Sequence, residues 1–139
     1  MQDVLFITTR ARVANKPDNL VEIETIHEDY TGIIKHCDVI MTKPGYGILM
    51  DALVHQKPLI HTDRGRFAEY PVLRNWLYES YPSVYLSQEN FRAGHWEEAL
   101  HRVFALKGTF PEVDLDGAFV LASFIHQKIK GGNHALETD

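Results

Sequence analysis

Apolar residues occur along the first two thirds of this chain in short runs, separated by polar stretches that contain Gly and Pro. Short continuous apolar runs are typical of parallel strands that are buried on both faces. The runs predict strands at residues 4–7, 20–23, 38–42, 58–61 and 84–86. Between them, apolar residues at helical spacing predict helices near 30–36, 48–55 and 67–78.

Two apolar stripes at helical spacing follow near the C-terminus, and we expect both to pack into the core. The first consists of Trp96, Ala99, Leu100, Val103 and Phe104, and the second of Ala118, Leu121, Ala122, Ile125 and Ile129. Two successive glycines at 131 and 132 end the second helix. We therefore expect a single domain over residues 1–130 and a mobile tail over residues 131–139.

Strands that alternate with helices predict an α/β fold, a Rossmann-like parallel sheet with helices on both faces. In such sheets, ligands bind beyond the carboxyl ends of the strands, where the strand order reverses. This rule directs attention to the loops at residues 8–13, 25–28, 42–47 and 62–67.

Composition and charge narrow the classes of function. Of the 139 residues, 45% are hydrophobic and 24% are charged, which is typical of a globular protein. The formal net charge of −5 argues against a nucleic-acid-binding surface, because phosphates are neutralised by clustered Lys and Arg. No apolar run approaches the ~18 residues of a transmembrane helix, and the chain starts without a signal-peptide pattern. Cys37 is the only cysteine. We expect a cytoplasmic protein that reaches a membrane, if at all, through a partner.

The turn after the third predicted strand is the first candidate site. Its glycines, Gly45 and Gly47, allow positive φ angles and the close approach of a ligand to the backbone. The helix that begins there offers N–H groups and a positive dipole end to a phosphate, while Lys43 adds a charge and Tyr46 lies between the glycines. A plain strand-to-helix turn without a ligand fits the same residues equally well.

A second group of polar residues follows in the sequence. Asp51, one turn into the helix, has the carboxylate that a ribose diol requires, although an acidic residue near a helix N-terminus is also favourable without a ligand. Arg64 and Arg66 form a potential clamp for a diphosphate, and Glu69 and Asn75 follow on the next helix. A solvated loop with surface ion pairs is the alternative interpretation.

The eight histidines do not predict a metal site, because none of them has a ligand-like spacing beside a carboxylate. His27 and His61 stand apart from the others, since both fall at predicted ligand-facing loops.

From residue 19 to residue 104 the chain resembles the C-terminal, donor-binding domain of family 28 glycosyltransferases, which include MurG. The resemblance rests on the continuous run from His36 to Ile60, with its Asp-strand opening, Gly-rich turn, helix and following strand. The Lys-Pro-Gly-Tyr-Gly turn and the later Arg-Phe-Ala-Glu-Tyr-Pro-Val-Leu-Arg-Asn segment are most similar to the glycosyltransferase-like region that precedes the kinase in plant L-arabinokinases, and to its bacterial relatives.

The resemblance implies the C-terminal half of a GT-B fold, lacking its first β-α unit. Such enzymes are metal-independent and inverting, need no cofactor, and use a nucleotide-diphospho-sugar, here UDP-linked, as substrate. By position, phosphate contacts come from Gly45, Tyr46 and Gly47. The ribose is held by Asp51, the base lies near His27, and the donor sugar lies near Glu69 and Asn75.

Three positions differ from the family pattern. Ile48 and Met50 stand where hydroxyl-bearing residues are usual, and Asp51 stands where a longer glutamate is usual. The acceptor-binding half is absent, so the resemblance implies a transferase that needs an acceptor-binding domain or subunit. Two further interpretations are a non-catalytic nucleotide-sugar-binding domain and a protein-interaction domain that uses exposed Trp76, Tyr78 and Tyr81. A truncated sheet also exposes an edge, which predicts self-association or a partner along the N-terminal strand.

Overall fold

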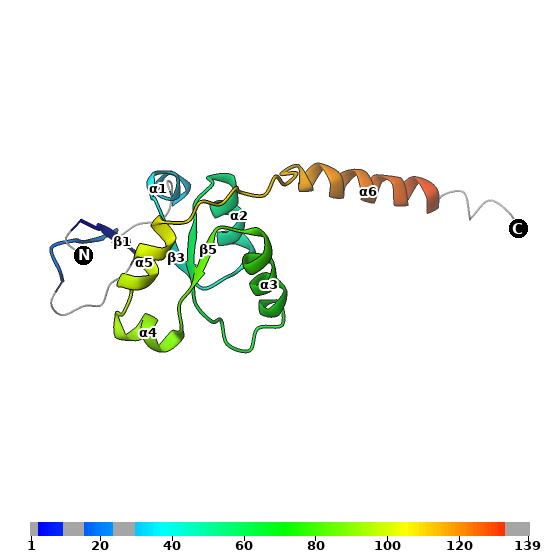
Figure 1. Ribbon diagram of the computed structural model, residues 1–139. Helices are drawn as coiled ribbons and strands as arrows, with labels where there is room; N and C mark the ends of the chain where they lie inside the picture. Colours follow the sequence, from blue (N-terminus) through cyan, green and yellow to red (C-terminus); the bar gives the residue numbers. More distant parts are fainter. Residues whose placement is uncertain (1–2, 10–15, 24–29, 133–139) are drawn as a thin grey trace, which may run out of the picture.

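In the computed structural model, described here for residues 3–9, 16–23 and 30–132, strands and helices alternate as in an α/β protein (Figure 1). The strands are β1 (Phe6–Thr8), β2 (Leu20–Glu22), β3 (Ile40–Thr42), β4 (Leu59–His61) and β5 (Ser83–Tyr85). The helices are α1 (Tyr30–His36), α2 (Tyr46–Val54), α3 (Tyr70–Ser80), α4 (Gln88–Ala93), α5 (Glu97–Phe104) and α6 (Gly117–Gly132).

The strands form two small parallel sheets rather than one continuous sheet. One sheet contains β1 and β2, and the other has the order β3-β4-β5. In the larger sheet, Met41 pairs with Ile60 and Ile60 pairs with Val84, so β4 is the central strand. Because α2 and α3 connect its parallel strands, the three-stranded sheet has the connectivity of a Rossmann-like fold.

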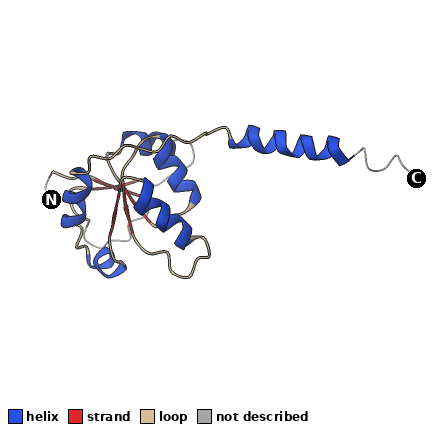
Figure 2. Cartoon of the chain, turned by 45° about the vertical axis from the view of Figure 1, so that its right-hand side comes forward, coloured by secondary structure: helices blue, strands red, loops and turns tan. Residues whose placement is uncertain are grey.

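Helices cover both faces of the larger sheet (Figure 2). Alternate residues of β4 point to opposite faces, as the pleat of a strand requires. Leu59 packs with the buried residues of α1, α2 and α3, whereas Ile60 packs with those of α5. The structure therefore confirms the predicted α/β fold with helices on both faces of a parallel sheet.

β1 differs from the sequence expectation, which placed it between two covered faces. Leu5 and Ile7 are exposed, while Phe6 lies 5.3 Å from the Trp96 ring, measured between ring centroids. Phe6 packs against the cluster that contains the buried residues of α5, whereas Leu5 and Ile7 stay exposed, so the expectation of burial on both faces is wrong. The helix α4, which starts at a Ser87 cap, was not predicted.

The last helix, α6, is the largest departure from the expected packing. It extends away from the rest of the protein at the end of a long connection (Figure 1). Its predicted core stripe is exposed: Leu121 is 59%, Ile125 48% and Ile129 62% accessible. The expectation that this stripe packs into the core is wrong, because both faces of the sheet are already covered by α1, α2, α3 and α5. The first stripe does pack, through Ala99, Leu100 and Val103.

Candidate functional site

The loops that follow β3 and β4 lie side by side at the carboxyl edge of the sheet. The backbone N–H of Thr62 donates to the Thr42 carbonyl over 3.2 Å, which joins the two loops where they leave their strands. The other two loops that the sequence singled out fall largely on residues 10–15 and 24–29, which lie outside the described residues, as does His27.

Gly45 and Gly47 hold positions that differ from those expected. Gly45 precedes α2 in an extended conformation, with φ −159°, and Gly47 lies within the helix. Neither glycine uses the positive φ that it allows; among the described glycines, Gly65 and Gly94 have that conformation. A side chain at Gly45 would collide with the guanidinium of Arg64, so close approach of another group explains this glycine.

Arg64 connects the two loops through its side chain. Its Nη1 donates to the Pro44 carbonyl over 2.8 Å, and its guanidinium carbon lies 4.0 Å from the centroid of the Phe67 ring. These contacts hold the positive charge beside Gly45, at the N-terminus of α2. First-turn N–H groups of a helix have no carbonyl partner within the helix, so their dipole and the Arg64 charge act together on an anion.

Asp63, which the sequence analysis did not select, organises the loop that carries Arg64. Its two carboxylate oxygens accept hydrogen bonds of 2.7 Å each, from the hydroxyls of Tyr70 and Tyr85. The side chain of Gln88 donates to its carbonyl over 2.8 Å. The two hydroxyls lower the pKa of Asp63, because they stabilise the ionised carboxylate. Burial and the Asp63 bond raise the pKa of Tyr70. Asp63 is thus a positioning residue that ties α3, β5 and α4 to one loop.

His61 and Thr62 lie beneath this loop and are almost fully buried. Both ring nitrogens of His61 and the hydroxyl of Thr62 lack a hydrogen-bond partner. The Tyr78 ring meets the imidazole edge-on, at 6.0 Å between centroids. Burial lowers the pKa of His61 from 6.5 to about 4, against a smaller opposing effect of Asp63. The imidazole is therefore neutral at physiological pH and does not supply a charge to the site.

The remaining predicted site residues are more scattered. Asp51 is half-buried on α2; after burial, its carboxylate is the next cause of the raised pKa of Tyr30 at the start of α1. It therefore lies near the first residue of α1. Several other predicted residues are exposed: Lys43, Tyr46, Arg66, Glu69 and Asn75.

The proposed aromatic contact surface is wrong for two of its three residues. Tyr81 is buried and its hydroxyl donates to the Lys57 carbonyl over 2.8 Å. Trp76 packs against it, with 5.2 Å between ring centroids. Both side chains belong to the core, and Tyr78 is the exposed member of the group.

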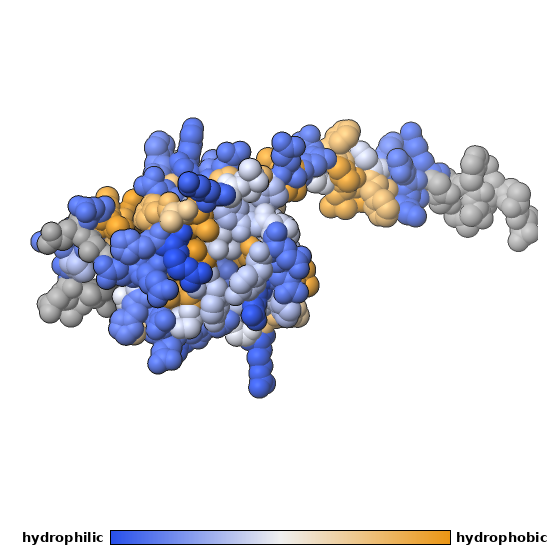
Figure 3. All heavy atoms as spheres, in the orientation of Figure 1, coloured by the Kyte–Doolittle hydropathy of each residue, from blue (hydrophilic) through white to orange (hydrophobic). Residues whose placement is uncertain are grey.

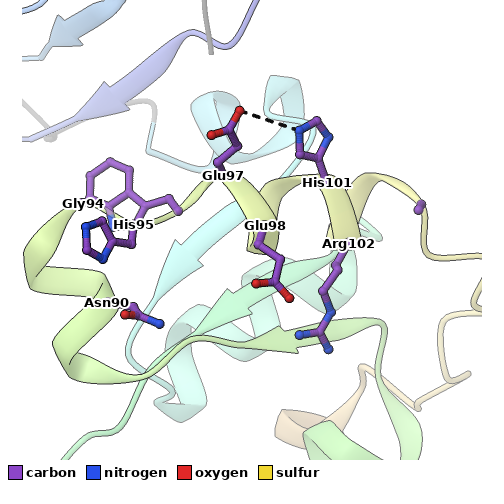
Figure 4. Close-up of a pocket in the computed structure, with 9 residues that line it drawn as sticks. Asn90, Gly94, His95, Glu97, Glu98, His101 and Arg102 are labelled. Carbon is purple, nitrogen blue, oxygen red and sulfur yellow. Dashed lines mark ion pairs between the residues drawn. The ribbon is translucent and has the colours of Figure 1, made fainter.

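A hollow of about 800 Å³ lies away from these loops, between α4 and α5 (Figure 4). Glu97 and His101 form an ion pair of 4.0 Å on one side of α5, and Glu98 and Arg102 extend on the other (Figure 4). These side chains are exposed and of mixed charge, so the hollow has the character of an open polar surface. Among the described residues, no three His, Cys, Asp or Glu side chains are grouped to hold a metal ion.

Comparisons with known proteins give two partial similarities. The chain is 28% identical over 122 residues to L-arabinokinase of Arabidopsis thaliana, covering 87% of this chain but 12% of that protein. It is also 36% identical over 62 residues to the DNA-directed RNA polymerase subunit Rpo11 of Methanocaldococcus jannaschii, covering 43% of this chain and 59% of that subunit.

The chain thus spans less than two thirds of each of these proteins. No model of a known family matches the chain, and no solved structure matches it. Among the described helices, none has the length and apolar character needed to cross a membrane.

Proposed function

We propose that this chain is the donor-side domain of a hexosyl or N-acetylhexosaminyl transferase, which binds a UDP-linked sugar at the carboxyl ends of β3 and β4. The observation that carries the proposal is the position of Arg64, whose guanidinium lies over the Gly45 backbone at the N-terminus of α2. The chain is also similar to L-arabinokinase over 87% of its length, and the sequence motifs resemble the glycosyltransferase-like region of proteins of that kind.

An incoming diphosphate would compete for the Arg64 guanidinium. In the present arrangement one N–H of that group donates a hydrogen bond to the Pro44 carbonyl, which is neutral. A phosphate oxygen is a stronger acceptor than a carbonyl, and a guanidinium binds two phosphate oxygens at once. The exchange would leave Gly45 open to the ligand and would add the N–H groups of the first turn of α2.

Asp51 gives the proposal its preference for a nucleotide over a free diphosphate. Asp51 lies six residues after Gly45, a rise of roughly 9 Å along the helix at ~1.5 Å per residue, which is about the distance between a diphosphate and the far side of its ribose. The carboxylate accepts hydrogen bonds from both ribose hydroxyls. Met50 and Ile48 provide no hydroxyl, so Asp51 has the larger share of this contact.

Catalysis is proposed to need an acceptor-binding domain or subunit, because neither of the two titratable groups in and beneath the loop after β4 is suited to act as a general base. His61 is buried and neutral beneath the loop, and Asp63 is saturated by two tyrosine hydroxyls. If the chain works without catalysis, the same donor loops serve a nucleotide-sugar-binding module. The exposed apolar helix α6 favours a protein-interaction role as the second candidate function.

Titration calorimetry in EDTA with UDP, UDP-N-acetylglucosamine, GDP and pyrophosphate tests the proposal. We expect micromolar binding of a uridine nucleotide without magnesium. Arg64→Ala should weaken UDP and pyrophosphate alike, by about tenfold or more, since each lost charge-assisted bond is worth about 1.5–3 kcal/mol. Asp51→Asn should weaken UDP but leave pyrophosphate unchanged.

Arg102→Ala, on the exposed side of α5, is the matched control and should change neither affinity. If the parent protein binds none of the nucleotides, the donor-site proposal is wrong and the interaction module is favoured. If a nucleotide binds but Arg64→Ala has no effect, the ligand lies elsewhere.

A further inference from the structure

The α6 helix carries an apolar surface that is exposed along one face. Leu121, Ile125 and Ile129 lie on one face of the helix at i, i+4 and i+8, and all are about half exposed or more. Ala118 and Ala122 lie on the same face, where small side chains permit a second helix to approach closely. Figure 3 shows apolar side chains gathered along the middle of this protruding helix.

Charges are distributed unevenly along α6. Asp114 and Asp116 precede its first turn, and Lys128 and Lys130 lie in its last turns. The Nζ of Lys128 lies 5.5 Å from the centroid of the Phe124 ring, so this lysine flanks the apolar surface. Two acidic residues therefore precede the helix, its middle is apolar, and its last turns are basic.

We propose that two copies of this chain associate through antiparallel contact of their α6 helices. The position midway between Asp116 and Lys130 is residue 123, and the apolar stripe from Ala118 to Ile129 is centred between residues 123 and 124. A single antiparallel pairing about this point therefore buries both stripes and also places each acidic end beside a basic end. The two helix dipoles are then antiparallel as well, which is the favourable arrangement.

The symmetry of the contact also fits a second copy. A two-fold axis through the middle of α6 uses the same surface on both partners, which is the usual geometry of a homodimer. α6 extends away from the sheet and its covering helices, so a second helix can reach it along its full length (Figure 1). A parallel pairing would instead bring Lys128 and Lys130 against their own copies.

The expected affinity follows from the size of the helix. Sixteen residues form a helix about 24 Å long and about 11 Å wide. Covering half its circumference removes roughly 400 Å² from each partner, about 800 Å² in total, whereas standard stable interfaces bury about 1,200–2,000 Å². We therefore expect a reversible dimer with a Kd of about 10–100 µM.

Sedimentation equilibrium of the full chain from ~1 µM to ~1 mM measures this association. Leu121→Glu with Ile125→Glu should weaken it by about 100-fold or more, because two charges would be buried without partners. Gln127→Glu, on the opposite side of the helix, is the matched control and should have little effect. The thermal midpoint of the sheet should stay unchanged, since none of the buried core residues lies in α6.

Charge reversal tests the antiparallel direction. Lys128→Glu with Lys130→Glu should weaken the dimer by about tenfold, and adding Asp114→Lys with Asp116→Lys should restore it to within a few-fold. Lys35→Glu with Lys107→Glu produces the same net charge on exposed lysines outside α6, and should leave the dimer intact. A parallel dimer would not respond to either reversal. A chain that stays monomeric at ~1 mM, or a dimer that survives Leu121→Glu with Ile125→Glu, would overturn the proposal.

Discussion

The buried imidazole of His61 should make this protein lose stability as the pH falls from 7 to 5. Its pKa is lowered from 6.5 to about 4 because burial opposes the charged form. In the unfolded chain the same imidazole has its ordinary pKa and takes up a proton near pH 6.5. Below that pH the unfolded state binds more protons than the folded state, so stability decreases as the pH decreases.

The magnitude follows from the two pKa values. For a folded pKa of about 4 and an unfolded pKa of about 6.5, the contribution lost between pH 7 and pH 5 is about 2 kcal/mol, and it reaches about 3 kcal/mol at pH 4. Two charged groups act on this titration: Asp63 opposes the shift and Arg74 adds to it. The loss is confined to the window between the two pKa values.

Urea unfolding at several pH values, for the parent and for His61→Leu, measures this contribution. The variant lacks the titrating group and should lose about 2 kcal/mol less than the parent between pH 7 and pH 5. Leucine also removes two ring nitrogens that lack hydrogen-bond partners, so we expect little cost at pH 7. His95→Leu, at an exposed position, should retain the pH dependence of the parent. If the parent and His61→Leu lose stability equally, to within about 0.5 kcal/mol, the imidazole is not desolvated in the folded state.

Two further predictions concern the loops after β3 and β4, and both are measured as free energies of unfolding in urea. Gly45→Ala should displace Arg64 and lower the free energy of unfolding by about 1 kcal/mol, but by almost nothing in an Arg64→Ala background. As a control, Gly47→Ala places its methyl group in open space within α2 and should raise the free energy of unfolding by about 0.5–1 kcal/mol. An equal cost of Gly45→Ala in both backgrounds would show that its Cβ meets something other than Arg64. Tyr85→Phe should destabilise by about 1 kcal/mol, and by less than half of that in an Asp63→Ala background, because its hydroxyl then has no carboxylate to bond. If Tyr85→Phe costs the same in both backgrounds, the Tyr85 hydroxyl and the Asp63 carboxylate do not interact in the folded protein.

The parallel strands and most of the helices of this fold could be predicted from the sequence. Continuous apolar runs marked the five described strands. For the central strand the reason is that a strand covered on both faces needs apolar side chains on both. The run at Leu59 and Ile60 shows this, since the two residues enter opposite cores. The exposure of Leu5 and Ile7 could not be predicted, because the pattern does not specify which neighbouring element covers a strand.

The predicted site residues had a different outcome. Gly45 and Gly47 were selected because glycine allows a positive φ and a close approach; neither has a positive φ, and the group that approaches Gly45 is the Arg64 side chain. Asp63 was overlooked because a carboxylate among charged loop residues is usually solvated. Its two tyrosine partners are 7 and 22 residues away along the chain, so only the folded structure brings them together. A carboxylate two residues after a central buried strand is the signal that could have identified it.

The apolar stripe of α6 shows most clearly the difference between what a sequence pattern predicts and what only the folded structure shows. The helical spacing of Leu121, Ile125 and Ile129 predicts an apolar face that burial would stabilise. It does not specify which surface packs against that face. The segment that leads to α6 runs past the C-terminal end of α2, where Phe110 and Val113 share a hollow with Leu53 and Val54. The proposed donor loops lie at the N-terminal end of the same helix, beside Gly45. Association through α6 therefore leaves the carboxyl edge of the sheet open, and a nucleotide bound beside Arg64 does not need the dimer.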